Sequence, residues 1–235
     1  METSLHRELK SFYAGEDARF EVPVGKYRID AVSGGRLIEI QHGSLAAIRD
    51  KVRNLLEDHQ VLVVKPIVVH KLLVKRSAEG GRVIGRRMSP KRGRLLDLFE
   101  DLVHFTRVFP HHRLTLEVPL VDIEEWRYPG HGRRRRWHRN DHQIEDQRLV
   151  TVRETHRLRT CWDLWKTFSC PLPREFHTGH LAESLAVDRW IAQRIAYCLR
   201  EMGAVRQVGK QGNAQLYALV GPKGDRKAAP PKPAG

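Results

Sequence analysis

The chain has 235 residues, 40% of them hydrophobic, which is enough to bury a core and to form one large domain or, as we expect, two small ones. Its formal net charge of +14 and pI of about 10.1 favour a nucleic-acid partner, because basic side chains release the counterions condensed on a polyanion; the alternative is a merely soluble basic protein. No apolar run approaches membrane-spanning length, no signal-peptide core is present and the three cysteines form no close pair, which excludes a membrane span, a disulfide framework and a thiolate zinc site and predicts a cytoplasmic protein.

The first predicted helix covers residues Ser4 to Ala14 and is followed by a strand at Phe20 to Val24. Its apolar residues recur at helical spacing and a glycine ends it: Leu5, Leu9, Phe12 and Gly15. Glu8 flanks the apolar stripe. We expect it either to point toward the acidic hairpin described next or to be a solvated residue of the helix surface.

A hairpin is predicted from Tyr27 to Gln41, where two alternating runs flank Gly34 and Gly35. Paired residues then have numbers that sum to 69, so Asp30 lies directly across from Glu39. Facing carboxylates repel each other, and a cation is therefore expected between them. Mg²⁺ is the natural candidate, because it prefers carboxylate and water oxygens and needs only one or two protein carboxylates.

Asp30 followed by Glu39-Ile40-Gln41 resembles the acidic hairpin of the PD-(D/E)XK superfamily of restriction-endonuclease-like nucleases, which carries an Asp on one strand and Glu-x-Lys on the next. Gln41 departs from this pattern, since lysine is usual there. The resemblance covers roughly the first half of the chain. It implies that Asp30 and Glu39 bind Mg²⁺ or Mn²⁺ and that Gln41 positions water or phosphate. Some members carry an acid on the first helix, as Glu8 would be, or bring the lysine from a neighbouring helix.

A second helix is predicted to begin after Ser44, with one apolar face and one basic side. Lys51 on the basic side either supplies the positive charge that Gln41 lacks or belongs to a solvated or phosphate-contacting face. A nearly continuous apolar run from Val61 to Val69 then predicts a buried strand reached by a parallel crossover. The order α, β, β, β, α, β is that of the resembled superfamily.

Three further elements are expected to complete a first domain of residues 1–126: a hairpin within Lys75 to Arg94, an amphipathic helix from Arg94 to Val108 and a strand from Leu114 to Leu120. Residues 127–159 are expected to form a basic loop and a connecting strand. The loop is predicted to contact phosphates and to stack on an unpaired base, with a solvated basic loop as the alternative. Its candidate contacts are Arg133, Arg134, Arg135, Arg136 and Trp137.

Residues 160–220 show three helical segments followed by two β-like runs, an order that resembles a winged helix. Such a domain binds DNA or serves as a contact for another protein or a second copy of the chain. The third helix, Arg189 to Met202, is predicted to present the DNA-contacting surface, together with the turn between the two β-like runs. The candidate contacts are Arg189, Gln193, Arg200 and Lys210. The tail, residues 221–235, is predicted to be disordered.

The sequence therefore predicts an α/β (α+β) protein with a restriction-endonuclease-like αβββαβ core and a small winged-helix domain. The expected activity is divalent-metal-dependent hydrolysis of DNA phosphodiesters by Asp30, Glu39 and Gln41, with contributions from Glu8 and Lys51. The alternative is a catalytically inactive nuclease fold that binds DNA or recruits a partner as a regulator.

Overall fold

The computed structural model describes residues 3–130, 141–167 and 171–221. The chain divides into two compact units, Met1–Arg159 and Thr160–Gly235, each of which mixes helices and strands. The basic run Arg133 to Trp137 and the tail from residue 222 lie outside the described residues. Among those that are described, no helix is long and apolar enough to cross a membrane.

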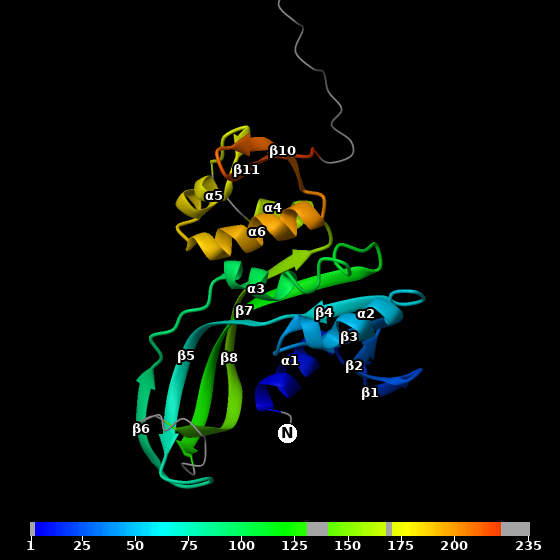
Figure 1. The fold of residues 1–235 in the computed structure, drawn as a ribbon. Helices are drawn as coiled ribbons and strands as arrows, with labels where there is room; N and C mark the ends of the chain where they lie inside the picture. Colours follow the sequence, from blue (N-terminus) through cyan, green and yellow to red (C-terminus); the bar gives the residue numbers. More distant parts are fainter. Residues whose placement is uncertain (1–2, 131–140, 168–170, 222–235) are drawn as a thin grey trace, which may run out of the picture. The chain divides into compact units, whose positions relative to one another are not determined.

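The first unit is built on one mixed sheet of eight strands (Figure 1). Its strands are β1 (Arg19–Val24), β2 (Tyr27–Ser33), β3 (Arg36–Ile40), β4 (Gln60–Val64), β5 (Ile67–Arg76), β6 (Val83–Met88), β7 (Leu114–Pro129) and β8 (His142–Leu158). The order is β1-β2-β3-β4-β7-β5-β6, and β8 pairs with β7. Pairing is parallel for β3 with β4 and for β7 with both β4 and β5, and it is antiparallel elsewhere.

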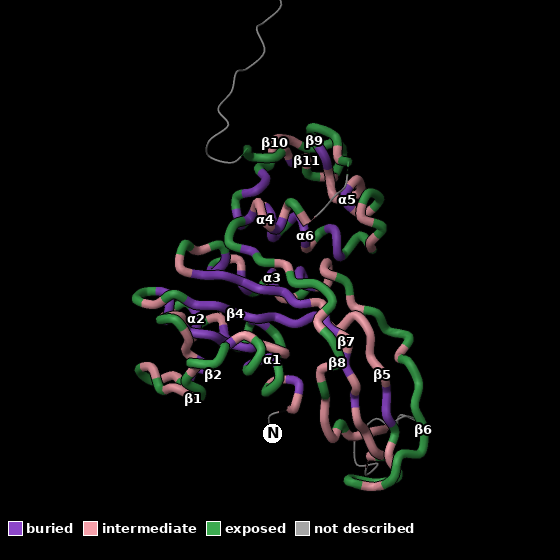
Figure 2. The backbone as a smooth tube through the Cα atoms, turned by 180° about the vertical axis from the view of Figure 1, so that it is seen from behind, coloured by how far each residue is buried: buried purple, intermediate pink, exposed green. Residues whose placement is uncertain are grey.

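Helices cover both faces of this sheet. Helix α1 (Ser4–Ala14) packs on the face that presents Ile38, Ile40 and Leu62. The 3₁₀ turn η1 (Leu45–Ile48) continues into α2 (Arg49–Leu55), which lies on the opposite face, where Glu39 points. Because alternate strand residues face opposite ways, β4 is buried on both sides, as its colour in Figure 2 shows.

The β2–β3 hairpin has the predicted register. Its pairs Ser33 with Arg36 and Ala31 with Ile38 both sum to 69, and Gly34 and Gly35 form the turn with positive φ angles. The β2–β3 ladder ends after the pair Ala31 with Ile38. Beyond it, the Ile40 N–H donates to the side-chain carboxylate of Asp30 at 2.7 Å instead of to a backbone carbonyl. Strand β3 then continues alongside β4, so Asp30 and Glu39 lie where β2 and β3 separate.

Two predicted elements differ from the structure. The run Val61 to Val69 is not one strand, because Pro66 has no N–H to donate and divides it into β4 and β5. The helix predicted for Arg94 to Val108 is only the 3₁₀ turn η2 (Leu95–Leu98), the four-residue α3 (Phe99–Leu102) and further turns. Backbone bonds there span three residues, as from Phe105 N to Leu102 O, and the β-branched and aromatic residues that follow α3 are weak helix formers.

The boundary predicted at Trp126 falls inside β7. This strand runs on to Pro129, and β8 pairs with it from Leu158 back to His142, so the strand content of residues 127–158 belongs to the sheet of the first unit. The indole of Trp126 lies between two guanidinium groups, those of Arg76 and Arg148, each 4.6 Å from the ring centroid. These contacts help to tie β5, β7 and β8 into one ribbon.

The second unit contains α4 (Cys161–Lys166), β9 (Glu175–Phe176), α5 (Thr178–Ser184), α6 (Arg189–Glu201), β10 (Val205–Gln211) and β11 (Ala214–Leu219). Its three strands pair in the order β10-β11-β9. The apolar face predicted for α6 is buried, as confirmed for Ile191, Ile195, Cys198, Leu199 and Met202. Strand β9 was not predicted, because two residues are too few to show an alternating pattern.

Candidate active site

Asp30 is held at the end of the β2–β3 ladder by two donors. Its Oδ2 accepts the Ile40 N–H at 2.7 Å, and its Oδ1 lies 3.3 Å from His6 Nε2 on α1. Burial alone would raise the pKa of this carboxyl, but the hydrogen bonds from His6 and Ile40 outweigh that effect and lower it. Asp30 is therefore a fixed, ionised carboxylate at neutral pH.

Glu39 is only 7% exposed and uses one carboxylate oxygen. Its Oε1 accepts a hydrogen bond from Lys51 Nζ at 2.6 Å, whereas its Oε2 is buried without a hydrogen-bond partner. Burial and the charge of Asp30 together raise the pKa of Glu39, although Lys51 opposes the shift. One oxygen of the Glu39 carboxylate is thus still able to accept a ligand.

Lys51 lies beside the acidic pair and is not a solvated side chain. The first turn of α2 directs its Nζ to Glu39 Oε1 and to the backbone carbonyl of Arg28, each at 2.6 Å, and the side chain is 17% exposed. A cation was expected between the carboxylates, and the structure places this ammonium on one of them.

Gln41 makes a contact that the sequence did not predict. Strand β3 ends at Ile40, and the Gln41 side chain turns into the following loop, where Nε2 donates to Ser44 O at 2.7 Å. The amide therefore braces the β3–η1 loop.

Glu8 lies away from the acidic pair. Its Oε2 accepts the Leu149 N–H of β8 at 2.6 Å, so it does not point toward the hairpin, and its side chain is exposed, as the solvated alternative expects. The reason is helical phase: Glu8 is two residues, or about 200°, from both His6 and Lys10, and these two residues occupy the side of α1 that faces the hairpin.

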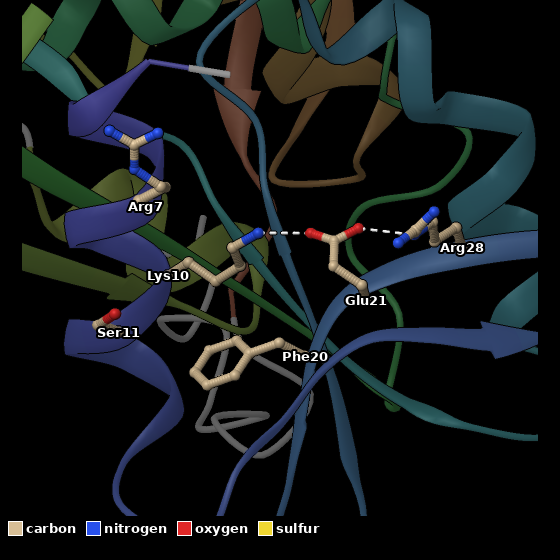
Figure 3. Close-up of a pocket in the computed structure, with 6 residues that line it drawn as sticks. All are labelled: Arg7, Lys10, Ser11, Phe20, Glu21 and Arg28. Carbon is tan, nitrogen blue, oxygen red and sulfur yellow. Dashed lines mark hydrogen bonds and ion pairs between the residues drawn. The ribbon is translucent and has the colours of Figure 1, made fainter. Parts of the chain in front are cut away.

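A second charged cluster adjoins Asp30 (Figure 3). The carboxylate of Glu21 on β1 lies between Lys10 Nζ of α1 and Arg28 Nε of β2, the latter at 2.8 Å. The hydrogen bond from Lys10 lowers the pKa of Glu21, and the charge of Lys10 also helps to lower the pKa of Asp30. Glu21 has φ = 54°, a strained conformation for a residue with a side chain.

This cluster lines an open cavity of about 530 Å³, whose walls include the ring of Phe20, 46% exposed. Sequence reasoning missed His6, Lys10, Glu21 and Arg28. Only the docking of α1 against β1 and β2 brings them together, and no spacing along the chain encodes that docking.

The loop after β3 is anchored by Lys65, the residue that follows β4. Lys65 Nζ donates to His42 O at 3.2 Å and to Gly43 O at 2.6 Å and pairs with Asp101 at 3.0 Å. Burial, followed by the charges of Lys65 and Lys71, lowers the pKa of His42 to about 4. Its buried Nε2 has no hydrogen-bond partner, so the ring is neutral at physiological pH.

The predicted DNA contacts of the second unit lie mostly on exposed positions. Arg189, Gln193 and Lys210 are exposed, while Arg200 is half-buried and pairs with Glu201 at 2.8 Å. Two exposed aromatic residues of α6 were not predicted, Trp190 and Tyr197, each with a guanidinium over its ring. Their spacing of seven residues, which is two helical turns, could have indicated that both lie on one side of α6. The structure does not describe the other predicted contacts, Arg133 to Trp137.

Asp30 and Glu39 suffice in number and kind for a hard divalent cation. Within residues 3–130, 141–167 and 171–221, no three His, Cys, Asp or Glu side chains are arranged to hold a metal ion. Mg²⁺ nevertheless needs only one or two carboxylates and keeps several waters. The unpartnered Glu39 Oε2 fits such an ion, which would share or displace the contact of Lys51 with Glu39.

Comparison with known proteins assigns the first unit to a family. Residues 3–159 match the model of the family described as Domain of unknown function (DUF8091), and the chain belongs to that family. It is also similar to an uncharacterized protein of Treponema pallidum (strain Nichols), with 28% identity over 232 residues, which covers 98% of this chain and 90% of the other. No solved structure matches the chain. The family match spans nearly the whole first unit, so the acidic hairpin, α1, α2 and β8 all lie within it.

Proposed function

We propose that the first unit is a divalent-metal-dependent nuclease of the PD-(D/E)XK type that hydrolyses DNA phosphodiesters. The observation that carries this proposal is the buried, unpartnered Oε2 of Glu39 beside the ionised carboxylate of Asp30. Burying such a group costs free energy that a bound cation would offset. A carboxyl whose pKa is shifted by burial and by a neighbouring charge is a candidate for a functional site.

The arrangement around the acids also supports the proposal. Helix α1 precedes three antiparallel strands, and α2 then leads to β4, which runs parallel to β3, the order expected of that superfamily. The +14 net charge of the chain favours a polyanionic substrate. Lys51 stands on α2 and not at the usual position two residues after the glutamate.

Each residue of the site has a different role in the proposed reaction. Asp30 and Glu39 would hold Mg²⁺ or Mn²⁺, which, when bound, polarises the phosphate and activates a water molecule. The ammonium of Lys51 stabilises negative charge that develops on the phosphate oxygens. His6 keeps Asp30 in its ionised form and in a fixed orientation.

The proposal is tested with linear, supercoiled and single-stranded DNA, with and without Mg²⁺ or Mn²⁺. We expect cleavage that depends on the metal, and a melting temperature that rises with metal by mass action on the folded state. The variant Asp30→Asn/Glu39→Gln is expected to lose both responses. Glu16→Gln/Asp17→Asn is the matched control, because it removes two exposed carboxylates from the turn after α1. An unchanged metal response in the Asp30/Glu39 variant would refute the site.

A catalytically inactive DNA-binding or partner-recruiting protein is the second candidate. One observation favours it: Lys51 contacts Glu39 and His6 contacts Asp30, so each carboxylate already has a cationic or hydrogen-bonding partner within the protein. Metal-dependent stabilisation without cleavage of any of the three DNA forms would decide for this alternative.

For the second unit we propose a winged helix that binds DNA through α6. Three helices, a three-stranded sheet and an exposed β10–β11 turn support this assignment. The outer face of α6 combines Arg189 and Gln193 with the aromatic ring of Trp190, side chains that suit phosphates and bases.

Replacing Arg189 and Gln193 with alanine is expected to weaken DNA binding by at least about tenfold, because each direct contact contributes roughly 1–3 kcal/mol. The matched control is Arg206→Ala/Gln207→Ala, which removes the same two residue types from exposed positions of β10. Affinities are measured by fluorescence anisotropy at fixed salt. Equal affinities for the parent and both variants would reassign the unit to protein contact.

A further inference from the structure

A basic cavity of about 460 Å³ lies in the first unit, between the start of β5 and the segment Ser89–Arg94. Five cationic side chains line it: Lys65, Lys71, Lys91, Arg92 and Arg94. None of them was singled out by the sequence or used in the proposed chemistry.

The backbone that carries this wall is held against β5. Ser89 N donates to Lys71 O at 2.8 Å, and Gly93 N donates to Val68 O at 3.0 Å. A Cβ at Gly93 would lie 2.3 Å from Val68 O, so only glycine permits this approach. The cavity is therefore formed by fixed backbone, and a ligand would meet a preorganised wall.

The charges that line the cavity do not cancel. Lys65 pairs with Asp101 at 3.0 Å and Lys71 with Glu125 at 2.6 Å, and both lysines are thus neutralised by carboxylates. Among the residues that the structure describes, the side chains of Lys91 and Arg92 make no ion pair or hydrogen bond, and both are exposed.

Two lining carboxylates are engaged as acceptors. Asp97 Oδ2 accepts the Arg94 N–H at 2.9 Å, and Asp101 also accepts the Leu45 N–H at 3.2 Å. The third, Glu100, is exposed. Lys91 and Arg92 are therefore cations of this wall that no carboxylate contacts among the described residues.

The cavity is linked to the acidic hairpin through Lys65. In the parallel register Ile40 pairs with Val64, so Lys65 follows beside Gln41 and lies on the same face of the sheet as Glu39. Its Nζ holds the carbonyls of His42 and Gly43, which begin the loop that joins β3 to η1. The cavity thus shares Lys65 with the anchor of the loop that follows Glu39.

We propose that this cavity binds a phosphate group of the nucleic acid, with Lys91 and Arg92 as its direct contacts, and that the buried Lys65 and the half-buried Lys71 form its inner wall. An arginine fork and an ammonium group beside it suit tetrahedral oxyanions. The identity of the ligand as nucleic acid rests on the proposed function. Binding of phosphate itself does not depend on that function, and it is tested separately.

The first test uses inorganic phosphate without divalent metal, against chloride at equal ionic strength. Phosphate is expected to raise the melting temperature of the parent, and Lys91→Ala/Arg92→Ala is expected to lose at least half of that rise. The control Arg19→Ala/Lys26→Ala also removes one arginine and one lysine, both exposed, from the opposite edge of the sheet. Equal rises in all three proteins would overturn the proposal.

The second test identifies the source of the phosphate by using oligonucleotides with a 5′-phosphate or a 5′-hydroxyl, again without metal. Weaker binding of only the phosphorylated oligonucleotide by the Lys91/Arg92 variant identifies a terminal monoester. Weaker binding of both, with the salt dependence reduced by about 0.9 counterion, identifies a backbone diester. Unchanged affinity for both would overturn phosphate capture, whether or not the protein cleaves DNA. The metal response of Asp30 and Glu39 is measured on the same variant and is expected to persist.

Discussion

Replacing Lys51 with methionine is expected to lower metal-dependent DNA cleavage by about 100-fold, since removal of one preorganised donor to developing negative charge typically has an effect of that order. Methionine keeps much of the volume of the side chain but removes the ammonium that contacts Glu39 Oε1. The rate constant for cleavage at saturating metal is the measurement.

The same variant is expected to bind Mg²⁺ at least as tightly as the parent, because the ammonium and the metal compete for the Glu39 carboxylate. This opposite change separates a catalytic role from general damage to the site. Arg53→Met on the same helix is the control, since its side chain is exposed and pairs only with Asp50 among the described residues. If Lys51→Met cleaved DNA at the parental rate, the lysine would have only a structural role.

Acidification from pH 7 to pH 4 is expected to destabilise the protein through His42. The pKa of this residue is about 4 in the fold against an ordinary 6.5, because burial and the charges of Lys65 and Lys71 disfavour the imidazolium. The unfolded chain therefore takes up the proton first. Stability is fully present above pH 6.5 and is lost as the pH falls toward 4, by an amount on the order of 3 kcal/mol.

His42→Gln is expected to remove this part of the pH dependence, as measured by urea unfolding at pH 7, 5.5 and 4.5. Asp30 does not interfere in this range, because its lowered pKa lies below 3.8 and its contribution is lost only at still lower pH. The raised pKa of Glu39 makes acidification favour the folded state, which is opposite to the effect of His42. This contribution is the same in the parent and in His42→Gln, so it cancels in the comparison. The control is His104→Gln, at an exposed position. Parallel curves for the parent and His42→Gln would show that His42 is protonated equally in both states.

The sequence alone determined the features that arise from local geometry. Two glycines between alternating strands set the register that brings Asp30 and Glu39 to the end of one hairpin, because a one-residue slip would turn the apolar side chains to the wrong face. Helical spacing likewise identified the buried face of α6. The patterns along the chain also predicted the order α, β, β, β, α, β for the elements from α1 to β4.

Only the tertiary structure decided which side chains surround those two acids. Lys51 contacts Glu39, because α2 docks on that face of the sheet, whereas the amide of Gln41 contacts Ser44 O. His6, and not Glu8, faces Asp30, because the phase of α1 is set by its packing against the sheet. These contacts join residues 12 to 24 positions apart, and the basic cavity joins Lys65 to Arg92. Their geometry depends on how packed elements are oriented, which periodicity within each element does not encode.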